Sequence, residues 1–247
     1  QPRPEHRASR AVRFETFARG AEAVRALAQS GLDPANCRLI DELEAFQTGA
    51  GDGTFSVLVL GMESTDHAVD EDLAQGLRIC REHGGVPDPP PEPSGDGGSV
   101  GAWRAAFIRM PYLRDLLLRL GILSDTFETA VTWDRFPDFH HTVMGAVREA
   151  LGEPCRVTCR FTHVYPDGPA PYITVIAPAR RGDEVAQWHE MKQAAGDAII
   201  AGGGTITHHH AVGRDHRPWY DAQRPDVVAA ALRGAKAAVD PAGVMNP

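Results

Sequence analysis

The sequence predicts an α+β fold with a mixed or antiparallel sheet. Segments with strand and helix patterns alternate on both sides of a stretch rich in proline and glycine at residues 84–99. Two strand-like segments, 156–165 and 170–178, are separated by Pro-Asp-Gly-Pro, which indicates a β-hairpin and therefore antiparallel pairing. The motifs GxGxxG, GxxxxGK[ST] and GxSxG are absent, so no loop of the sequence is recognisable as a nucleotide site.

Periodicity in the first half predicts three strands and two helices. Apolar residues recur at helical spacing from Phe17 to Ala28, and Gly31 follows as a stop signal. Leu73 and Leu77 mark the inner face of a second helix. The predicted order is a strand at 11–17, a helix at 18–31, strands at 36–41 and 54–62, and a helix at 69–83.

Residues 84–99 are so rich in proline, glycine and acidic residues that no packed element is expected there. The stretch is interpreted as a mobile surface loop, and a loop without a catalytic role is the simpler alternative to a lid. Pro111 is expected to end or kink the helix that follows. The remaining predicted elements are a helix at 100–123, a strand at 127–134, a helix at 135–152, the hairpin, a helix at 183–201, a strand at 205–210 and a helix at 225–241.

Composition narrows the class of function. The 247 residues carry a formal net charge of -8 and are 43% hydrophobic, enough for one large or two small domains. Without a cluster of basic residues, nucleic acid and anionic membranes are not expected partners, and a small-molecule substrate is. Every apolar run is far shorter than the ~20 residues of a transmembrane helix. We expect a cytoplasmic protein with four reduced core thiols, at Cys37, Cys80, Cys155 and Cys159.

Three adjacent histidines, His208, His209 and His210, are the clearest candidate site. On the predicted last strand, side chains alternate between faces, so His208 and His210 would converge. Three consecutive titratable rings are poor core material, which favours a functional site over packing. Acid–base chemistry, the lining of a polar cavity, and a mononuclear metal site remain open, the last with His163 or His216 as a third ligand.

Two further residues are candidates because of their chemistry and position. Tyr172 lies on the predicted strand 170–178, where a phenol beside imidazoles would act as a general base or proton relay. The alternative is a sheet tyrosine with its hydroxyl at the rim. Arg114 follows Pro111 in an otherwise apolar segment and would bind an anionic group through its guanidinium. Its alternative is an ion pair with Asp115 or a solvated face.

Five segments in order carry a family resemblance: RMPYLRD, DTFETAVTWDR, CRFTHVYPDGPAPYITVIAP, GGGTITHHHAVGRDHRPWY and VDPAGVMNP. Together they resemble the C-terminal part of FAD-linked oxidases of the vanillyl-alcohol-oxidase type, and within these they are most similar to alkyldihydroxyacetonephosphate synthases. The resemblance runs from about residue 11 to the end. It implies that residues 1–247 form the cap, or substrate, domain, a large antiparallel sheet built from ferredoxin-like halves and flanked by helices, which covers the flavin.

The resemblance also implies a cofactor, partners and an activity. The cofactor is FAD, held mainly by an N-terminal FAD-binding domain of the same polypeptide that has no counterpart in this chain. In alkyldihydroxyacetonephosphate synthases, a fatty alcohol replaces the acyl chain of acyl-dihydroxyacetone phosphate at the flavin. The expected function is therefore catalysis on a small anionic or lipid-ester substrate. The fragment alone is expected to be inactive, and the resemblance is compatible with a homodimer.

The family's active-site residues fall on residues already singled out. Its tyrosine matches Tyr172, a proton acceptor, and its arginine matches Arg114, a ligand of the substrate's anionic group. Its histidine run matches His208, His209 and His210, which are expected to transfer protons near the flavin, His209 also contacting the cofactor. No metal is expected among them.

Asn246 matches a C-terminal segment that in these flavoproteins runs back toward the flavin, and it is the second expected cofactor contact. An alternative function is a 2-hydroxy acid oxidoreductase of the D-lactate or glycolate type. Such enzymes carry GHxGDGNxH and GEHGxG, which supply metal ligands, where this chain has THVYPDGPAPY and HHHAVG. A ferredoxin-like module that binds small ligands without chemistry is a second alternative.

Overall fold

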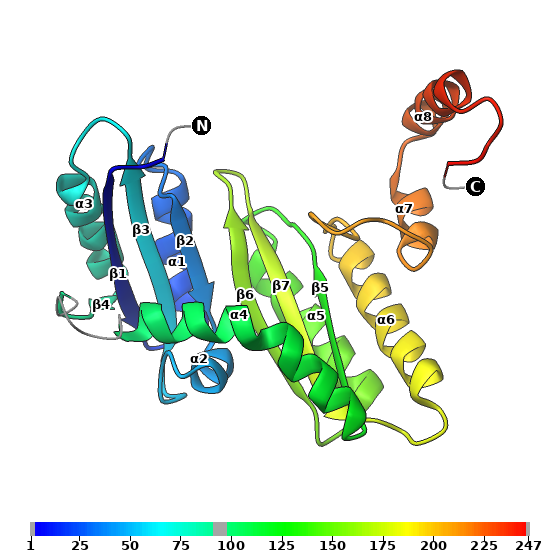
Figure 1. Ribbon diagram of the computed structural model, residues 1–247, viewed down its shortest axis with the longest axis horizontal. Helices are drawn as coiled ribbons and strands as arrows, with labels where there is room; N and C mark the ends of the chain where they lie inside the picture. The colour runs from blue at the N-terminus through cyan, green and yellow to red at the C-terminus, as the bar shows by residue number, and fades with distance from the viewer. Residues whose placement is uncertain (1–2, 91–97, 246–247) are drawn as a thin grey trace.

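The computed structural model describes residues 3–90 and 98–245, without the side chains of Phe107 and Pro111. It has a seven-stranded sheet in the order β4-β1-β3-β2-β6-β7-β5, and all of the strand pairings are antiparallel. Helices flank this sheet (Figure 1). The predicted α+β class with a large antiparallel sheet is therefore confirmed.

The first half of the sheet has ferredoxin-like topology, because two strand-helix-strand units interleave in the strand order β4-β1-β3-β2. The predicted strand at 11–17 begins earlier and ends sooner, because Thr16 accepts a hydrogen bond from the backbone N–H of Arg19 and caps a helix that starts at Phe17. A short helix after Asp41 was not predicted. The elements are β1 (His6–Phe14), α1 (Phe17–Ala28), β2 (Asn36–Ile40), α2 (Glu42–Thr48), β3 (Ser56–Ser64), α3 (Asp70–Glu82) and β4 (Val86–Pro87).

The second half repeats this pattern with three strands, in the order β6-β7-β5. The edge beside β5 is where a fourth strand would pair, and residues 205–210 run there without forming one. Thr205 donates to the carbonyl of Ala130 and His208 to that of Glu128 (2.9 and 3.1 Å). The elements are α4 (Gly98–Arg119), β5 (Ile122–Glu128), α5 (Phe136–Leu151), β6 (Arg156–Val164), β7 (Pro169–Pro178) and α6 (Glu184–Ala201).

Two strand predictions for this half are corrected. The strand predicted at 205–210 is wrong, because His209 adopts a left-handed backbone conformation (φ 56°) that breaks an extended strand. The strand predicted at 127–134 lies earlier, ending at Glu128. Of the two outcomes predicted for Pro111, an end or a kink of the helix, the end is excluded, because α4 continues through this residue. In the predicted loop 84–99, β4 and the start of α4 are ordered elements, and residues 91–97 lie outside the described residues.

The main core lies between the sheet and the helices α1, α3, α5 and α6, whereas α4 crosses the opposite face, called here the front face (Figure 1). Alternate residues along each strand point to the two faces. Val12 and Leu58 therefore enter the main core, and Ala11 and Val57 pack under Trp103 of α4. The four thiols are free, and three of them are buried as predicted, Cys155 being only partly so.

The two halves of the sheet meet at a narrow seam, where β2 and β6 share the single residue pair Ile40–Arg160. Beside it, Asp41 accepts a hydrogen bond from the backbone N–H of Cys159 at 2.6 Å. Arg160 forms an ion pair with Glu44 of α2, also at 2.6 Å. The seam therefore relies on side chains where the strands themselves make little contact.

The chain closes with an arm that extends from the body of the molecule (Figure 1). It consists of α7 (Arg217–Gln223), which was not predicted, and α8 (Asp226–Val239). Ala229 is the buried residue of α8, while Val227 and Val239 are among its exposed apolar residues. The arm thus carries apolar surface that the described part of the chain does not cover.

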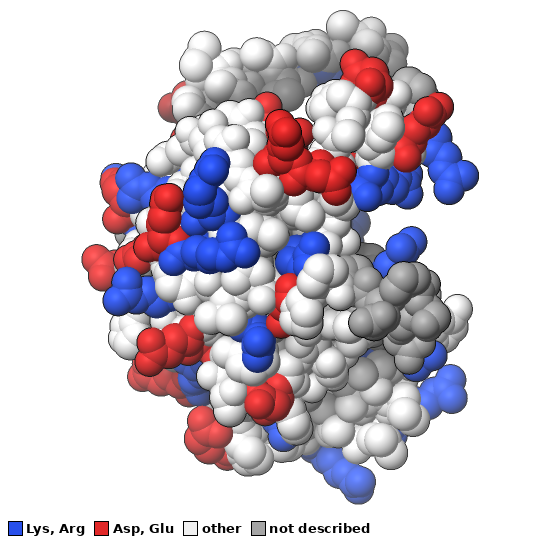
Figure 2. All heavy atoms as spheres, turned by 90° about the vertical axis from the view of Figure 1, so that its left-hand side faces the viewer, with Lys and Arg blue, Asp and Glu red and all other residues white. Residues whose placement is uncertain are grey.

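Charges are mixed on the side of the molecule shown in Figure 2, where basic and acidic side chains are interspersed without a continuous basic surface. Within the described residues, no helix combines the length and the apolar character needed to cross a membrane.

Candidate active site

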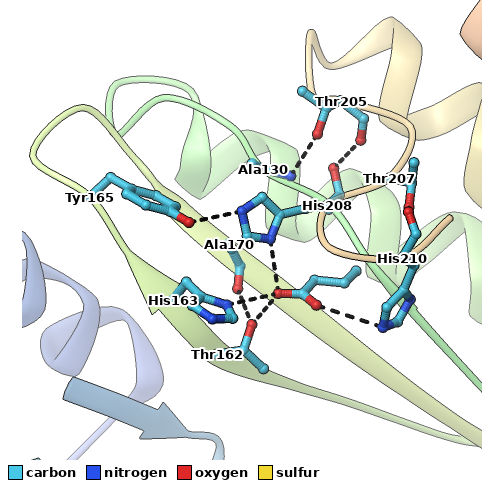
Figure 3. A network of polar contacts seen from close by, with 11 residues as sticks. Ala130, Thr162, His163, Tyr165, Ala170, Thr205, Thr207, His208 and His210 are labelled. Atoms are coloured by element: carbon cyan, nitrogen blue, oxygen red, sulfur yellow. Dashed lines mark hydrogen bonds and ion pairs between the residues drawn. The ribbon is translucent and has the colours of Figure 1, made fainter. Parts of the chain in front are cut away.

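The candidate active site is centred on the carboxylate of Glu128, the last residue of β5, which is only 3% exposed. Thr162 donates a hydrogen bond to its Oε1, and Nδ1 of His208 and Nδ1 of His163 lie 3.1 and 3.3 Å from the same oxygen. Nε2 of His210 lies 3.7 Å from Oε2 (Figure 3). Three imidazoles from two separate segments therefore converge on one buried carboxylate.

Electrostatics keep Glu128 ionised at neutral pH. Burial alone would raise the pKa of its carboxyl, but hydrogen bonds from Thr162, His208 and His163 outweigh burial and hold the pKa below its usual value. An ionised carboxylate only accepts hydrogen bonds, so the Nδ1 atoms of His208 and His163 carry hydrogens. Glu128 thereby selects the tautomer of both rings.

Glycines position the histidine segment against α5. A Cβ at Gly204 would lie 2.6 Å from a ring carbon of Phe139, and Gly203 has a left-handed φ of 76°. The segment is also braced by α7, because Gln223 donates to the carbonyl of Gly204 (2.8 Å) and accepts from the N–H of Ile206 (3.2 Å). The run of glycines before the histidines therefore serves close packing at the edge of β5.

His209, predicted to contact the cofactor, contacts two neighbouring imidazoles. Its exposed ring stacks on that of His208, with centroids 4.2 Å apart and planes 11° apart, and lies 4.2 Å from that of His163. His208 and His210 both approach Glu128, as the predicted convergence of these two rings requires, but the middle ring does not lie apart, because it stacks on His208. Asn246, the other predicted cofactor contact, lies outside the described residues.

Ring geometry argues against a preformed metal site. Nitrogen atoms of His163, His208 and His209 lie within 4.8 Å of one another. However, the lone pairs of an imidazole lie in the ring plane, and two nearly parallel stacked rings direct them side by side and not toward one point. The cluster as it stands is better suited to moving protons than to holding an ion.

Tyr172 lies beside this cluster on β7. Its hydroxyl donates to Thr126 Oγ1 (2.9 Å), and its ring approaches that of His210 edge-on with centroids 5.7 Å apart. The guanidinium of Arg160 lies over the tyrosine ring, 3.9 Å from its centroid, and is held by Glu44. The structure thus brings Tyr172 to the histidines, at the seam between the two sheet halves.

Arg114 and His216 are not brought to the cluster. Arg114 is exposed on α4, and its Nε donates to the carbonyl of Ser124 (3.3 Å), four residues before Glu128 and therefore about 13 Å away along the strand. His216 caps α7 and contacts the carbonyl of Ala211. The substrate-binding role predicted for Arg114 remains a prediction.

Sequence reasoning missed Glu128, Arg160 and the hydroxyl of Tyr165, which lies 3.0 Å from Nε2 of His208. Each of these belongs to a strand or turn that was predicted, but strand register was not. One signal was available, since Glu128 is a carboxylate beside Phe127 near the start of the predicted strand 127–134. Such a residue is seldom buried without partners.

The chain matches the family model described as FAD linked oxidases, C-terminal domain, over residues 3–247. Among curated proteins, it is 37% identical to an alkyldihydroxyacetonephosphate synthase of Caenorhabditis elegans over 141 residues, 54% of this chain and 23% of that protein. A Dictyostelium discoideum protein of the same name is 28% identical over 149 residues, 59% and 24% of the two chains. The matched regions thus span about a quarter of these relatives.

Solved structures share the fold. An alkyldihydroxyacetonephosphate synthase aligns with a TM-score of 0.73 at 18% identity, covering 98% of this chain and 44% of that one. A 4-ethylphenol oxidase from Gulosibacter chungangensis, solved with isoeugenol, aligns with a TM-score of 0.69 at 11% identity, covering 100% and 54%. At these identities the likeness concerns the fold alone.

Proposed function

Because this chain belongs to the FAD-linked oxidases and matches their C-terminal domain, we propose that it is the substrate-binding cap of an FAD-dependent enzyme of the alkyldihydroxyacetonephosphate-synthase type. Its substrate is a small anionic molecule or a lipid ester. The observation that carries the proposal is the convergence of His163, His208 and His210 on Glu128, with Tyr172 beside them.

The residues present suit a flavin as a neighbour. His209 and His163 are partly or fully exposed at the cluster, and their polar rings match the heteroatoms of an isoalloxazine edge. FAD, when bound, supplies the electron-accepting ring at which the substrate reacts. FAD is bound mainly by a domain that lies N-terminal to this chain in the same polypeptide.

The cap residues then divide the work around the substrate. Tyr172 accepts a proton from the substrate, with Thr126 as the first partner of its hydroxyl. The histidines pass protons, and Glu128 fixes which nitrogen of His163 and of His208 is available. We retain Arg114 as the candidate ligand of the anionic group, reached from the front face.

The test uses the full-length flavoprotein. Tyr172→Phe and His209→Ala should each lower turnover by about 10²-fold or more, the usual contribution of general acid–base catalysis, while FAD stays bound. Flavin absorbance measures the bound cofactor, and flavin bleaching with dihydroxyacetone-phosphate esters or D-2-hydroxy acids identifies the substrate class.

The matched controls are Tyr220→Phe and His141→Ala, both outside the cluster and expected to retain turnover. Retained activity in both Tyr172→Phe and His209→Ala would remove the catalytic assignment. Bleaching by D-2-hydroxy acids alone would replace the synthase-type proposal with the 2-hydroxy acid alternative.

A further inference from the structure

A second phenol, Tyr165, is coupled to the histidines more directly than Tyr172 is. Its hydroxyl lies 3.0 Å from Nε2 of His208, whereas the hydroxyl of Tyr172 donates to Thr126. On its other side, His208 meets Glu128 through Nδ1 at 3.1 Å (Figure 3). Phenol, imidazole and carboxylate therefore form one continuous hydrogen-bonded line.

The direction of these hydrogen bonds follows from the buried end. Glu128 is a carboxylate and only accepts, so His208 donates through Nδ1–H. A neutral His208 then has its lone pair on Nε2, and this nitrogen accepts from the hydroxyl of Tyr165. This is the logic by which a carboxylate orients a histidine toward a hydroxyl in nucleophile–base–carboxylate triads.

The backbone holds the outer end of the line in place. Tyr165 directly follows β6 at the turn of the β6–β7 hairpin, where its N–H donates to the carbonyl of Gly168 (2.9 Å). Its own carbonyl accepts from the indole N–H of Trp133, a core residue, at 3.0 Å. Tyr165 is 38% exposed and helps to line a cavity of about 230 Å³, together with Val131, Pro169 and Thr205. The line thus runs from a buried carboxylate to an accessible phenol.

We propose that Tyr165 is a second acid–base group of this enzyme, which exchanges a proton with a substrate hydroxyl while His208 and the positioning residue Glu128 support it. This rests on the proposed function, because the substrate is taken to carry a hydroxyl. The substrate O–H gives its proton to the Tyr165 oxygen as the phenol's own proton passes to Nε2 of His208. The products are an alkoxide and an imidazolium, and Glu128 remains ionised beside the imidazolium.

The first test removes one oxygen at the accessible end. Tyr165→Phe in the full-length flavoprotein should lower turnover by about 10²-fold or more and abolish the solvent deuterium isotope effect on turnover. KM should change little, because a phenyl ring of the same shape remains. The control Tyr220→Phe, which removes a phenol hydroxyl on α7, should keep both turnover and isotope effect. An unchanged turnover and isotope effect in Tyr165→Phe would overturn the proposal.

The second test reads the tautomer without any substrate. In the full-length flavoprotein labelled with ring-¹⁵N histidine, His208, assigned through His208→Gln, should be protonated at Nδ1. Glu128→Gln can donate through its side-chain amide and should shift the hydrogen to Nε2, which then no longer accepts from Tyr165. A His208 protonated only at Nε2 in the unmodified enzyme would refute the relay.

The two tests separate this proposal from the proposed function. If the enzyme bleaches with none of the offered esters but His208 has the expected tautomer that Glu128→Gln reverses, the assigned substrate fails and the relay stands. If the esters react and Tyr165→Phe behaves like the control, the relay fails and the assigned function stands. Glu128→Asp keeps the charge and should retain the Nδ1 tautomer. It is the control that distinguishes a change of tautomer from misfolding in Glu128→Gln.

Discussion

A single carboxylate decides the chemistry of this site at the scale of residues. Glu128 faces three imidazoles and one hydroxyl, and their hydrogen bonds compensate for the cost of its burial. If the carboxyl of Glu128 were protonated, it could donate a hydrogen bond as well as accept one. The tautomers of His163 and His208 would then no longer be fixed. The identity of one buried group thus sets the donor and acceptor pattern of its neighbours.

A second titratable residue, His140, affects stability and not chemistry. Its ring packs beside those of Phe17 and Phe136, and its Nε2 is buried without a partner in the described residues. Burial first, and then the nearby Arg148 and His141, lower the pKa of His140 to about 4. The ring therefore stays neutral in the folded protein at pH values where the unfolded chain takes up a proton.

From this we predict an acid-sensitive term in the free energy of unfolding. Below an unfolded pKa of about 6.5 the unfolded state binds more protons, so His140 should cost about 2 kcal/mol of stability between pH 7 and pH 5. His140→Phe, which places a third phenyl ring beside Phe17 and Phe136, should remove this loss. Denaturant unfolding at the two pH values measures it.

The exposed neighbour provides the control, because His141 is the smallest of the three causes, so His141→Gln should keep most of the acid sensitivity of the parent chain. An equal loss of stability in His140→Phe and in the parent between pH 7 and pH 5 would contradict the assignment.

The candidate residues were predicted from sequence to an uneven degree. His208 and His210 were expected to converge and do so, and Tyr172 lies beside them. Glu128 was missed because the side chains beside it depend on the pairing register of the strands. The sequence alone does not determine that register. Tyr165 was not predicted as a site residue because it lies at a turn, where a phenol is ordinarily solvated.

At the scale of elements, the histidine segment lies where a strand was predicted but does not form one. Residues 205–210 do run along β5, as a strand would, and two backbone hydrogen bonds join them to it. The left-handed His209 then turns the chain, which a β pattern of alternating side chains cannot reveal. The prediction identified the location, and local backbone geometry decided the conformation.

The glycines before this segment lead to a prediction. A methyl group at Gly204 would lie 2.6 Å from the Phe139 ring, so Gly204→Ala should displace the segment and lower turnover by about 10-fold or more, with FAD retained. Turnover and flavin content of the full-length enzyme measure this. Phe139→Leu in the same molecule should restore part of the activity by making room.

A glycine with open surroundings provides the comparison. At Gly145 in α5 an added methyl group meets nothing within 4 Å, so Gly145→Ala should keep full turnover. Loss of activity in Gly145→Ala, or full activity in Gly204→Ala, would argue against the packing explanation.

At the scale of the whole molecule, the two halves cohere through side chains. One residue pair joins β2 to β6, and Arg160 of one half is bound to Glu44 of the other. On the opposite face, Phe17 and Phe161 meet across the same seam with ring centroids 5.2 Å apart. The front-face contact is polar and the helix-side contact is aromatic.

Breaking the ion pair from one side should therefore be costly. Glu44→Ala leaves a buried guanidinium uncompensated and should lower the free energy of unfolding by about 3–5 kcal/mol. Combining it with Arg160→Met should recover much of that loss, which a double-mutant cycle in denaturant unfolding would show.

An exposed pair gives the contrast. Arg19 and Glu22 lie 3.8 Å apart with both side chains more than half exposed, so Glu22→Ala should cost less than about 1 kcal/mol. Equal effects of Glu44→Ala and Glu22→Ala would show that the seam does not depend on the ion pair.

The overall architecture was predicted in part from pattern and in part from resemblance. The hairpin at 156–178 established antiparallel pairing, but the ferredoxin-like halves followed from the family likeness, because strand order leaves no trace in periodicity. Neither the sequence pattern nor the resemblance predicted the seam, because the seam depends on how the two halves of the sheet meet.

The place of the histidine segment leaves its side chains replaceable. Two backbone hydrogen bonds, from Thr205 to Ala130 and from His208 to Glu128, join a loop to this edge of the sheet, and neither depends on the side chains at positions 208 to 210. Substitutions at these positions can therefore alter the candidate site while the seven strands keep their registers.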